Sequence, residues 1–190
     1  MEALLVSTGV VAIGEIGDKT QLLSLVLAAR FRRPWLICAG ILVATLTNHA
    51  LAGWVGNWVR GVVPADLLRW LLAASFFAVA LWALKPDRLD DDGSRKLTRW
   101  GVFGVTTVAF FLAEMGDKTQ VATVMLAARF DSLAQVVVGT TLGMMLANVP
   151  VVFAGDLASE KIPFKAIRIV AALLFAGIGV WVLVAGVPGG

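Results

Sequence analysis

The sequence predicts an all-α integral membrane protein with six transmembrane helices arranged as two inverted three-helix repeats. Three observations predict it: an excess of apolar residues, six long apolar segments and an internal repeat. The 190 residues are 59% hydrophobic with a mean hydropathy of +0.86, whereas soluble globular proteins are about 45–50% apolar. A span needs about 20 apolar residues, so six spans need about 120. This composition excludes a soluble enzyme, a nucleic-acid-binding domain and a secreted disulfide scaffold.

Apolar runs interrupted by charged residues give six candidate spans: 3–29, 34–59, 67–84, 100–128, 133–155 and 167–186. The polar segment 85–99 contains three consecutive aspartates. It separates a first repeat (1–84) from a second repeat (100–190). We expect this segment to be a solvated linker, with a divalent-ion sensor as the alternative.

The two halves are related by a shift of 99 residues. Residues 15–31 match residues 114–130 at 11 of 17 positions, which indicates an internal repeat of three spans per unit. Because three is an odd number, the second unit must enter the membrane from the opposite side, so the repeats are inverted. Inverted repeats are typical of secondary transporters, whose substrate site lies near the midplane between the repeats.

The distribution of Lys and Arg predicts the orientation. The 1–2, 3–4 and 5–6 loops carry eleven of these residues, and the side that holds the termini and the other loops carries three. Because positive residues accumulate in cytoplasmic loops, we expect the central linker in the cytoplasm and both termini outside. The basic residues are scattered rather than gathered on one surface, which indicates no nucleic-acid partner.

Six charged residues lie near the middle of the first and fourth candidate spans: Glu15, Asp18, Lys19, Glu114, Asp117 and Lys118. Each costs about 2.5–3.5 kcal/mol to insert at a helix centre, and intramembrane charges of this kind usually mark a functional site. In a continuous helix Glu15 and Asp18 would share one face. The glycine between them would alternatively permit a local break that exposes backbone carbonyls to a cavity. Inversion is expected to bring the four carboxylates together.

Oxygen-rich clusters suit hard divalent cations such as Mg²⁺, Ca²⁺ and Mn²⁺. The threonines and glutamines that follow the acids could supplement the carboxylates, although a threonine hydroxyl can instead bond its own backbone one turn earlier. Two mid-span asparagines could complete the shell or form ordinary interhelical hydrogen bonds. At the 99-residue offset, His49 rather than Asn48 is the match of Asn148, so the asparagines are not strict equivalents. These additional candidate ligands are Thr20, Thr119, Gln21, Gln120, Asn48 and Asn148.

Charge counting suggests a mechanism. Four carboxylates and two ammonium groups sum to −2, which one divalent cation or two protons would neutralise. Crowded carboxylates share protons, so metal and protons would compete for the same oxygens. The hypothesis predicts electrically silent exchange of one divalent cation for two protons. Lys19 and Lys118 could act as alternate gate partners or could merely balance charge.

At its two Glu-x-Gly-Asp-Lys-Thr motifs, 15–20 and 114–119, the sequence resembles the Golgi-type Mn²⁺/Ca²⁺:H⁺ exchanger family. A duplicated motif of this form in two inverted three-span halves is the mark of that family, and the resemblance covers essentially the full chain. It implies that the motif acids bind the ion and that Mn²⁺ is transported in exchange for protons. The short linker and the lack of an N-terminal extension resemble bacterial members, which implies the plasma (inner) membrane and export to the outside.

The resemblance also implies the partners. A divalent cation and the lipid bilayer are expected, with no obligatory protein partner. No cofactor is expected, because Mn²⁺ or Ca²⁺ would be the transported substrate and H⁺ the coupling ion.

Three alternatives remain beside Mn²⁺ transport. A Ca²⁺/H⁺ exchanger is the nearest, since Ca²⁺ takes six to eight flexible oxygens and Mn²⁺ favours an octahedral six with tolerance for nitrogen. An intramembrane aspartyl hydrolase would need two differentiated carboxyls, whereas these two motifs are identical in type, so we expect no enzyme. A scaffold would gain nothing from six midplane charges.

Overall fold

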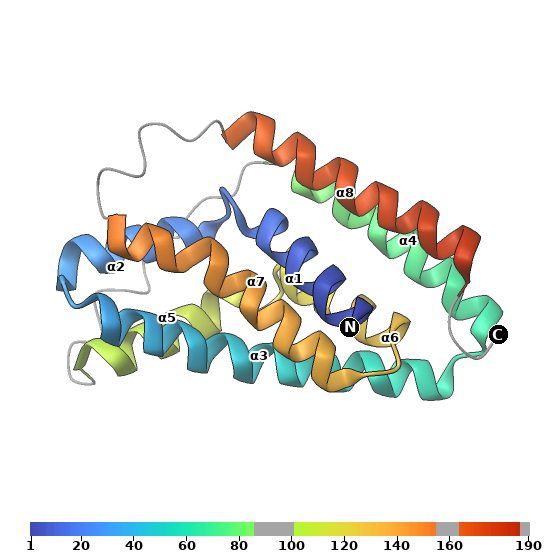
Figure 1. Ribbon diagram of the computed structural model, residues 1–190, viewed down its shortest axis with the longest axis horizontal. Helices are drawn as coiled ribbons and strands as arrows, with labels where there is room; N and C mark the ends of the chain where they lie inside the picture. The colour runs from blue at the N-terminus through green and yellow to red at the C-terminus, as the bar shows by residue number, and fades with distance from the viewer. Residues whose placement is uncertain (86–100, 155–163, 187–190) are drawn as a thin grey trace.

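The computed structural model describes residues 1–85, 101–154 and 164–186, and every regular element in these ranges is a helix (Figure 1). The all-helical prediction is confirmed for these residues. Apart from Lys85, the predicted linker 85–99 lies outside them. The helices are α1 (Glu2–Glu15), α2 (Lys19–Phe31), α3 (Pro34–Val62), α4 (Ala65–Ala83), α5 (Gly101–Glu114), α6 (Lys118–Arg129), α7 (Leu133–Ala154) and α8 (Phe164–Ala185).

The first and fourth predicted spans are each broken into two helices. Glu15 ends α1 and Asp18 precedes α2, so the interpretation that these acids share one face of a continuous helix is wrong. The glycine at each break has a left-handed backbone conformation, with φ of +80° at Gly17 and +75° at Gly116. Glycine adopts this conformation readily because it has no Cβ. The local break is therefore what the structure contains.

The two breaks have nearly the same geometry. The backbone N–H of Asp18 donates to the carbonyl of Glu15 at 3.0 Å, and that of Asp117 donates to Glu114 at 3.1 Å. The aspartates have φ and ψ of −83° and 169° in the first break and −84° and 163° in the second. The motif thus specifies one local conformation in both halves.

The half-helices pack across the two halves of the chain. α1 lies against α7, and its 99-residue counterpart α5 lies against α3. Both contacts are close because they include small residues. A Cβ added at Gly139 would lie 2.6 Å from the Leu4 carbonyl, and one added at the matching Gly40 would lie 2.7 Å from the Thr106 Cβ. α4 and α8 run side by side and contact α6 and α1, respectively (Figure 1).

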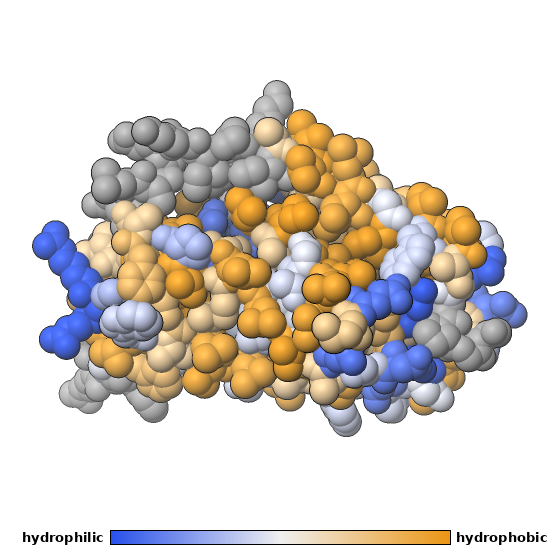
Figure 2. Space-filling model, viewed as in Figure 1, coloured by the Kyte–Doolittle hydropathy of each residue, from blue (hydrophilic) through white to orange (hydrophobic). Residues whose placement is uncertain are grey.

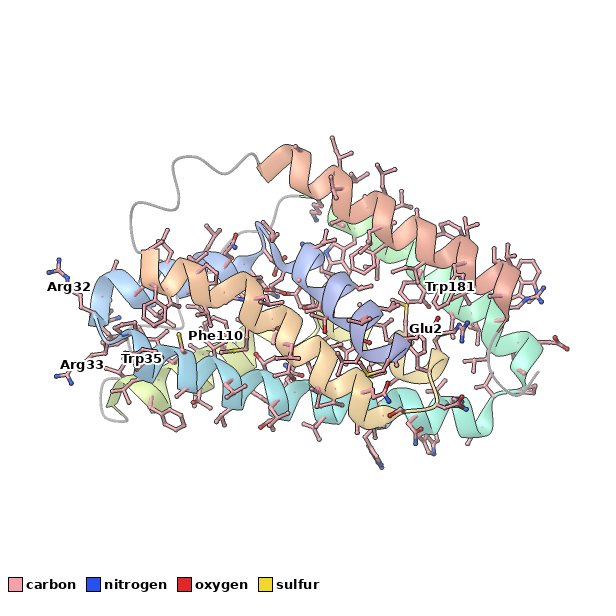
Figure 3. The ribbon with its side chains drawn as sticks, in the orientation of Figure 1. Glu2, Arg32, Arg33, Trp35, Phe110 and Trp181 are labelled. Carbon is pink, nitrogen blue, oxygen red and sulfur yellow. The ribbon has the colours of Figure 1, made fainter. Side chains whose placement is uncertain are left out.

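The surface suits a hydrocarbon environment. Among the described residues, the three helices α3, α4 and α7 are each long and apolar enough to cross a membrane. Figure 2 shows a mostly hydrophobic middle on the visible face, with hydrophilic residues gathered toward the two ends of the long axis. Arg32 and Arg33 project from one end, and Glu2 lies toward the other (Figure 3). This distribution is typical of a membrane protein with polar groups at both interfaces.

Candidate cation site

The two helix breaks place four carboxylates in the interior of the molecule. Glu15, Asp18, Glu114 and Asp117 are each at most 1% exposed. Asp18 and Asp117 occupy the N-cap positions of α2 and α6, where the unpaired N–H groups and the helix dipole stabilise negative charge. The Asp117 carboxylate also accepts a 2.6 Å hydrogen bond from the backbone N–H of Lys118. The Asp18 side chain makes no such capping hydrogen bond to α2, so the two N-caps differ in this contact.

Each motif lysine pairs with the aspartate of the other motif. Lys118 Nζ lies 2.5 Å from Asp18 Oδ1, and Lys19 Nζ lies 3.3 Å from Asp117 Oδ2. The two pairs differ in their access to the outside of the molecule, since the Lys118 side chain is 3% exposed and that of Lys19 is 25% exposed. These crossed ion pairs bring residues about 100 positions apart into direct contact and join the two breaks into one cluster.

The two glutamates have different surroundings. Glu114 Oε1 accepts a 2.6 Å hydrogen bond from Thr119 and lies 3.4 Å from His49 Nε2. Neither carboxylate oxygen of Glu15 has a hydrogen-bond partner among the described residues. Glu15 nevertheless lies within electrostatic reach of the other three carboxylates and of Lys118. A fully buried carboxylate without a partner is costly, so this position calls for a bound cation or proton.

The two motif threonines are also used differently. Thr119 donates to the Glu114 carboxylate rather than to its own backbone one turn earlier. The Thr20 hydroxyl is buried, and it has no hydrogen-bond partner among residues 1–85, 101–154 and 164–186. Both halves of the cluster therefore contain buried oxygens without a hydrogen-bond partner among the described residues, three around Glu15 (both Glu15 oxygens and the Thr20 hydroxyl) and Oε2 of Glu114 in the other half.

The motif glutamines stabilise the breaks. The Gln21 side-chain oxygen accepts from the backbone N–H of Gly17 at 2.8 Å, and that of Gln120 accepts from Gly116 at 2.7 Å. Their amide groups donate outward, Gln21 to the Ala147 carbonyl at 3.2 Å and Gln120 to the Asn48 side-chain oxygen. Because positions 48 and 147 are 99 residues apart, the two glutamines reach equivalent places on α3 and α7.

The two asparagines connect helices. Besides its bond with Gln120, Asn48 contacts the Phe111 carbonyl of α5 at 3.5 Å. Asn148 accepts from the Ser24 hydroxyl of α2 at 2.7 Å and donates to the Met144 carbonyl at 3.1 Å. The interhelical hydrogen bonds that the sequence left open are therefore present at both positions, and both amide oxygens already accept one hydrogen bond.

Two residues of this cluster were not among the predicted site residues. Ser24 is fully buried against Asn148, and nothing in its sequence context distinguishes it from a helix-packing serine. His49 is fully buried against Glu114. The repeat offset could have identified it, because adding 99 to 49 gives Asn148, a residue that was predicted to belong to the site.

The cluster in this conformation is closed by its own lysines. No three His, Cys, Asp or Glu side chains among the described residues lie close enough together to hold one metal ion. An open apolar groove of about 460 Å³ between α1 and α8, lined by residues such as Val10 and Trp181, contains none of the motif residues.

Comparison with known proteins identifies a family of cation transporters. Residues 3–91 and 102–189 match the family model described as the divalent cation/proton antiporter GDT1. The chain is 52% identical over 176 residues to a Vibrio cholerae protein named "Putative manganese exporter", covering 92% of this chain and 87% of that protein. It is 27% identical to a GDT1-like protein of Synechocystis, covering 87% and 88% of the two chains. It is 25% identical to GDT1-like protein 3 of Oryza sativa, covering 94% and 72%. No solved structure matches.

Proposed function

Because the chain belongs to the GDT1 family of divalent cation/proton antiporters, we propose that it exports Mn²⁺ in exchange for protons through one site built from both motifs. Members of this family are membrane transporters of divalent cations rather than enzymes. The observation that carries the proposed site is the crossed pairing of Asp18 with Lys118 and of Asp117 with Lys19. It gives the two halves a single shared cluster of charges.

The proposed architecture is six spans in two inverted repeats, 1–84 and 100–190. In this arrangement α1 with α2 forms one broken span and α5 with α6 forms another. The matching geometry of the two breaks and the two separate segments matched by the family model support it. Broken spans of this kind place unwound backbone and helix ends at membrane depth, which suits the binding of ions.

The proposed ligands are the motif carboxylates, assisted by the hydroxyls and amides around them. Glu15 and Thr20 are the first candidates, since their buried oxygens have no hydrogen-bond partner among the described residues. The aspartates would join once their lysines withdraw. The complete proposed set is Glu15, Asp18, Glu114, Asp117, Thr20, Thr119, Gln21, Gln120, Asn48 and Asn148, with Lys19 and Lys118 acting in gating or charge balance.

The proposed substrate follows from the name of the Vibrio cholerae relative and from the chemistry of the cluster. Carboxylate, hydroxyl and amide oxygens suit Mn²⁺ and Ca²⁺ alike, so Ca²⁺ is the alternative cation. A proton and a divalent cation would compete for the same buried oxygens. That competition couples the two fluxes, and no obligatory protein partner is required for it.

The proposed location is the inner membrane of a bacterium, with both termini outside and the central linker in the cytoplasm. The distribution of Lys and Arg over the loops supports this orientation. Arg32 and Arg33 lie at one end of the molecule, and Glu2 lies past the middle toward the other end (Figure 3). This separation agrees with a cytoplasmic 1–2 loop and an external N-terminus.

Flux measurements on purified protein in liposomes test the proposed function. Radioactive Mn²⁺ or Ca²⁺ is followed while a pH gradient is imposed, for the unaltered chain, Asp18→Asn and the control Asp66→Asn. Asp66 is an exposed acid in the first turn of α4. We expect proton-driven flux in the unaltered chain and in Asp66→Asn, and a loss of at least about tenfold in Asp18→Asn. Absence of flux in the unaltered chain, or equal flux in all three, overturns the proposal.

A further inference from the structure

His49 breaks the two-fold equivalence of the charged cluster. It lies on α3, and its counterpart on α7 at the 99-residue offset is Asn148. Asn148 uses both ends of its amide in hydrogen bonds to Ser24 and Met144. His49 is fully buried, its Nδ1 has no hydrogen-bond partner among the described residues, and its Nε2 faces the Glu114 carboxylate at 3.4 Å.

His49 and Glu114 are near enough to each other to become ligands of one ion. Neighbouring ligands of an octahedral ion with bonds of about 2.1–2.2 Å lie about 3 Å apart. The 3.4 Å between His49 Nε2 and Glu114 Oε1 is longer than that value, so the two atoms must move closer together to bind one Mn²⁺. When Nε2 carries a proton it donates a hydrogen bond to the Glu114 carboxylate; when it does not, its lone pair and the carboxylate oxygen require a positive centre between them. A divalent cation meets that requirement and would bind both atoms.

We propose that His49 supplies a nitrogen ligand to the transported cation and thereby selects transition-metal ions such as Mn²⁺ over Ca²⁺. This inference rests on the proposed function, because it assigns a further ligand to the same site. Among the candidate donors around the two breaks, the motif acids, threonines, glutamines and asparagines all offer oxygen. Ca²⁺ is bound by oxygen ligands, whereas divalent transition-metal ions accept imidazole. One imidazole in an oxygen cluster therefore discriminates between ions of equal charge.

The position of His49 explains how a duplicated motif can form a selective site. The two Glu-x-Gly-Asp-Lys-Thr-Gln segments differ only at their second residue, Ile16 and Met115, so on their own they make a symmetric set of oxygens. Helix α3 adds the imidazole on the Glu114 side, and α7 adds an amide already used for packing on the other. Selectivity thus comes from the helix that packs on the motif rather than from the motif.

Isotope labelling tests the proposed ligand directly, because His49 is the single histidine of the chain. The protein is prepared without a histidine tag and with ¹⁵N in histidine only, and bound Mn²⁺ is examined by pulsed electron paramagnetic resonance. We expect coupling of Mn²⁺ to a histidine nitrogen that changes with the isotope and disappears in His49→Asn. Bound Mn²⁺ without histidine coupling overturns the assignment.

Competition between cations tests selectivity. His49→Asn copies the residue at the matching position, and His49→Gln keeps a hydrogen-bond donor near Glu114 while removing the nitrogen lone pair. We expect both variants to shift the ratio of apparent Mn²⁺ to Ca²⁺ affinity toward Ca²⁺ by at least about tenfold, as loss of a group that supports a metal typically costs 10–100-fold. If His49→Gln keeps the ratio of Mn²⁺ to Ca²⁺ affinity of the unaltered chain, His49 only positions its neighbours and the inference is overturned.

The outcomes separate this inference from the proposed function. If the unaltered chain transports Mn²⁺ and Asp18→Asn does not, while the His49 variants keep the wild-type ratio, only the inference about His49 fails. If the unaltered chain neither binds Mn²⁺ nor moves any divalent cation against a proton gradient, both fail. Should the His49 variants not fold, the isotope experiment on the unaltered sequence still decides the assignment.

Discussion

Lys118 and Asp18 form an ion pair of 2.5 Å in which both side chains are almost fully buried. The two residues belong to different copies of the same motif, so the pair ties one half of the chain to the other. The reciprocal pair of Lys19 and Asp117 is longer, at 3.3 Å, and its lysine is 25% exposed. The cluster is therefore symmetric in its connections and asymmetric in its access to solvent.

This asymmetry predicts different effects of removing each lysine. Removing one partner of a buried pair costs about 3–5 kcal/mol, so we expect Lys118→Ala to lower the Tm markedly and Lys19→Ala to lower it less. Cys38 is the single thiol of the chain and is buried. Its labelling by a thiol-reactive dye during heating therefore reports unfolding. Equal Tm values for the two variants would contradict the difference in burial between Lys118 and Lys19.

Transport by the same two variants tests gating. If each lysine holds an aspartate closed on one side of the membrane, we expect both alanine variants to lose coupling between proton and cation flux in liposomes. Unchanged, fully coupled transport in both variants would leave charge balance as the role of Lys19 and Lys118.

The left-handed glycines predict a conformational requirement at each break. An added Cβ at Gly116 would meet no atom within 4 Å, so only its φ of +75° opposes a side chain. That conformation costs about 1–2 kcal/mol for a residue other than glycine. We expect Gly116→Ala to lower the Tm by a few degrees and to reduce transport. Gly61→Ala, in α3 and equally free of contacts, is the matched control and should retain both.

The close approach of α1 to α7 predicts a steric requirement at Gly139. A Cβ there would lie 2.6 Å from the Leu4 carbonyl, which the backbone cannot accommodate without moving the helices apart. We expect Gly139→Ala to destabilise the protein in the Cys38 labelling assay. Gly177→Ala places its Cβ in open space and should leave the Tm nearly unchanged. Similar Tm values would show that α1 and α7 are not held in close contact.

Charge counting predicts electrically silent exchange. Four carboxylates and two ammonium groups sum to −2, and one divalent cation or two protons neutralise that charge. A membrane potential of 100 mV contributes about 2.3 kcal/mol for each net charge that crosses the membrane. An exchange that moves no net charge should therefore be unaffected by the potential. The check is Mn²⁺ flux in liposomes at fixed pH with and without a potassium diffusion potential. A large change in flux with potential would refute the one-to-two stoichiometry.

Much of the fold could be predicted from the sequence because membrane helices have strong local signals. Pro34 is the first residue of α3 and Pro64 directly precedes α4, and the expected spans 34–59 and 67–84 lie close to the observed helices. The family resemblance, which rested on the two motifs, is confirmed by the family model. The break at Gly17 was one of two alternatives, because a glycine in an apolar run is compatible with either a packed helix or a left-handed turn.

The pairing within the site could not be predicted from the sequence. Lys19 adjoins Asp18 in the chain, yet it pairs with Asp117 because the packing of the two breaks brings the opposite motif closer. The contact between His49 and Glu114 depends in the same way on how α3 packs on α5 and α6. Sequence offsets identify equivalent positions, but tertiary packing determines which side chains meet.

The stoichiometry of Mn²⁺ binding tests the central claim most directly, namely that the two motifs form one site. Binding is titrated for the unaltered protein, Glu15→Gln and Glu114→Gln by the paramagnetic signal of free Mn²⁺. The account predicts one high-affinity ion per chain, with affinity lost in either variant. Two ions per chain, one of which disappears in each variant, would show two independent sites and would contradict it.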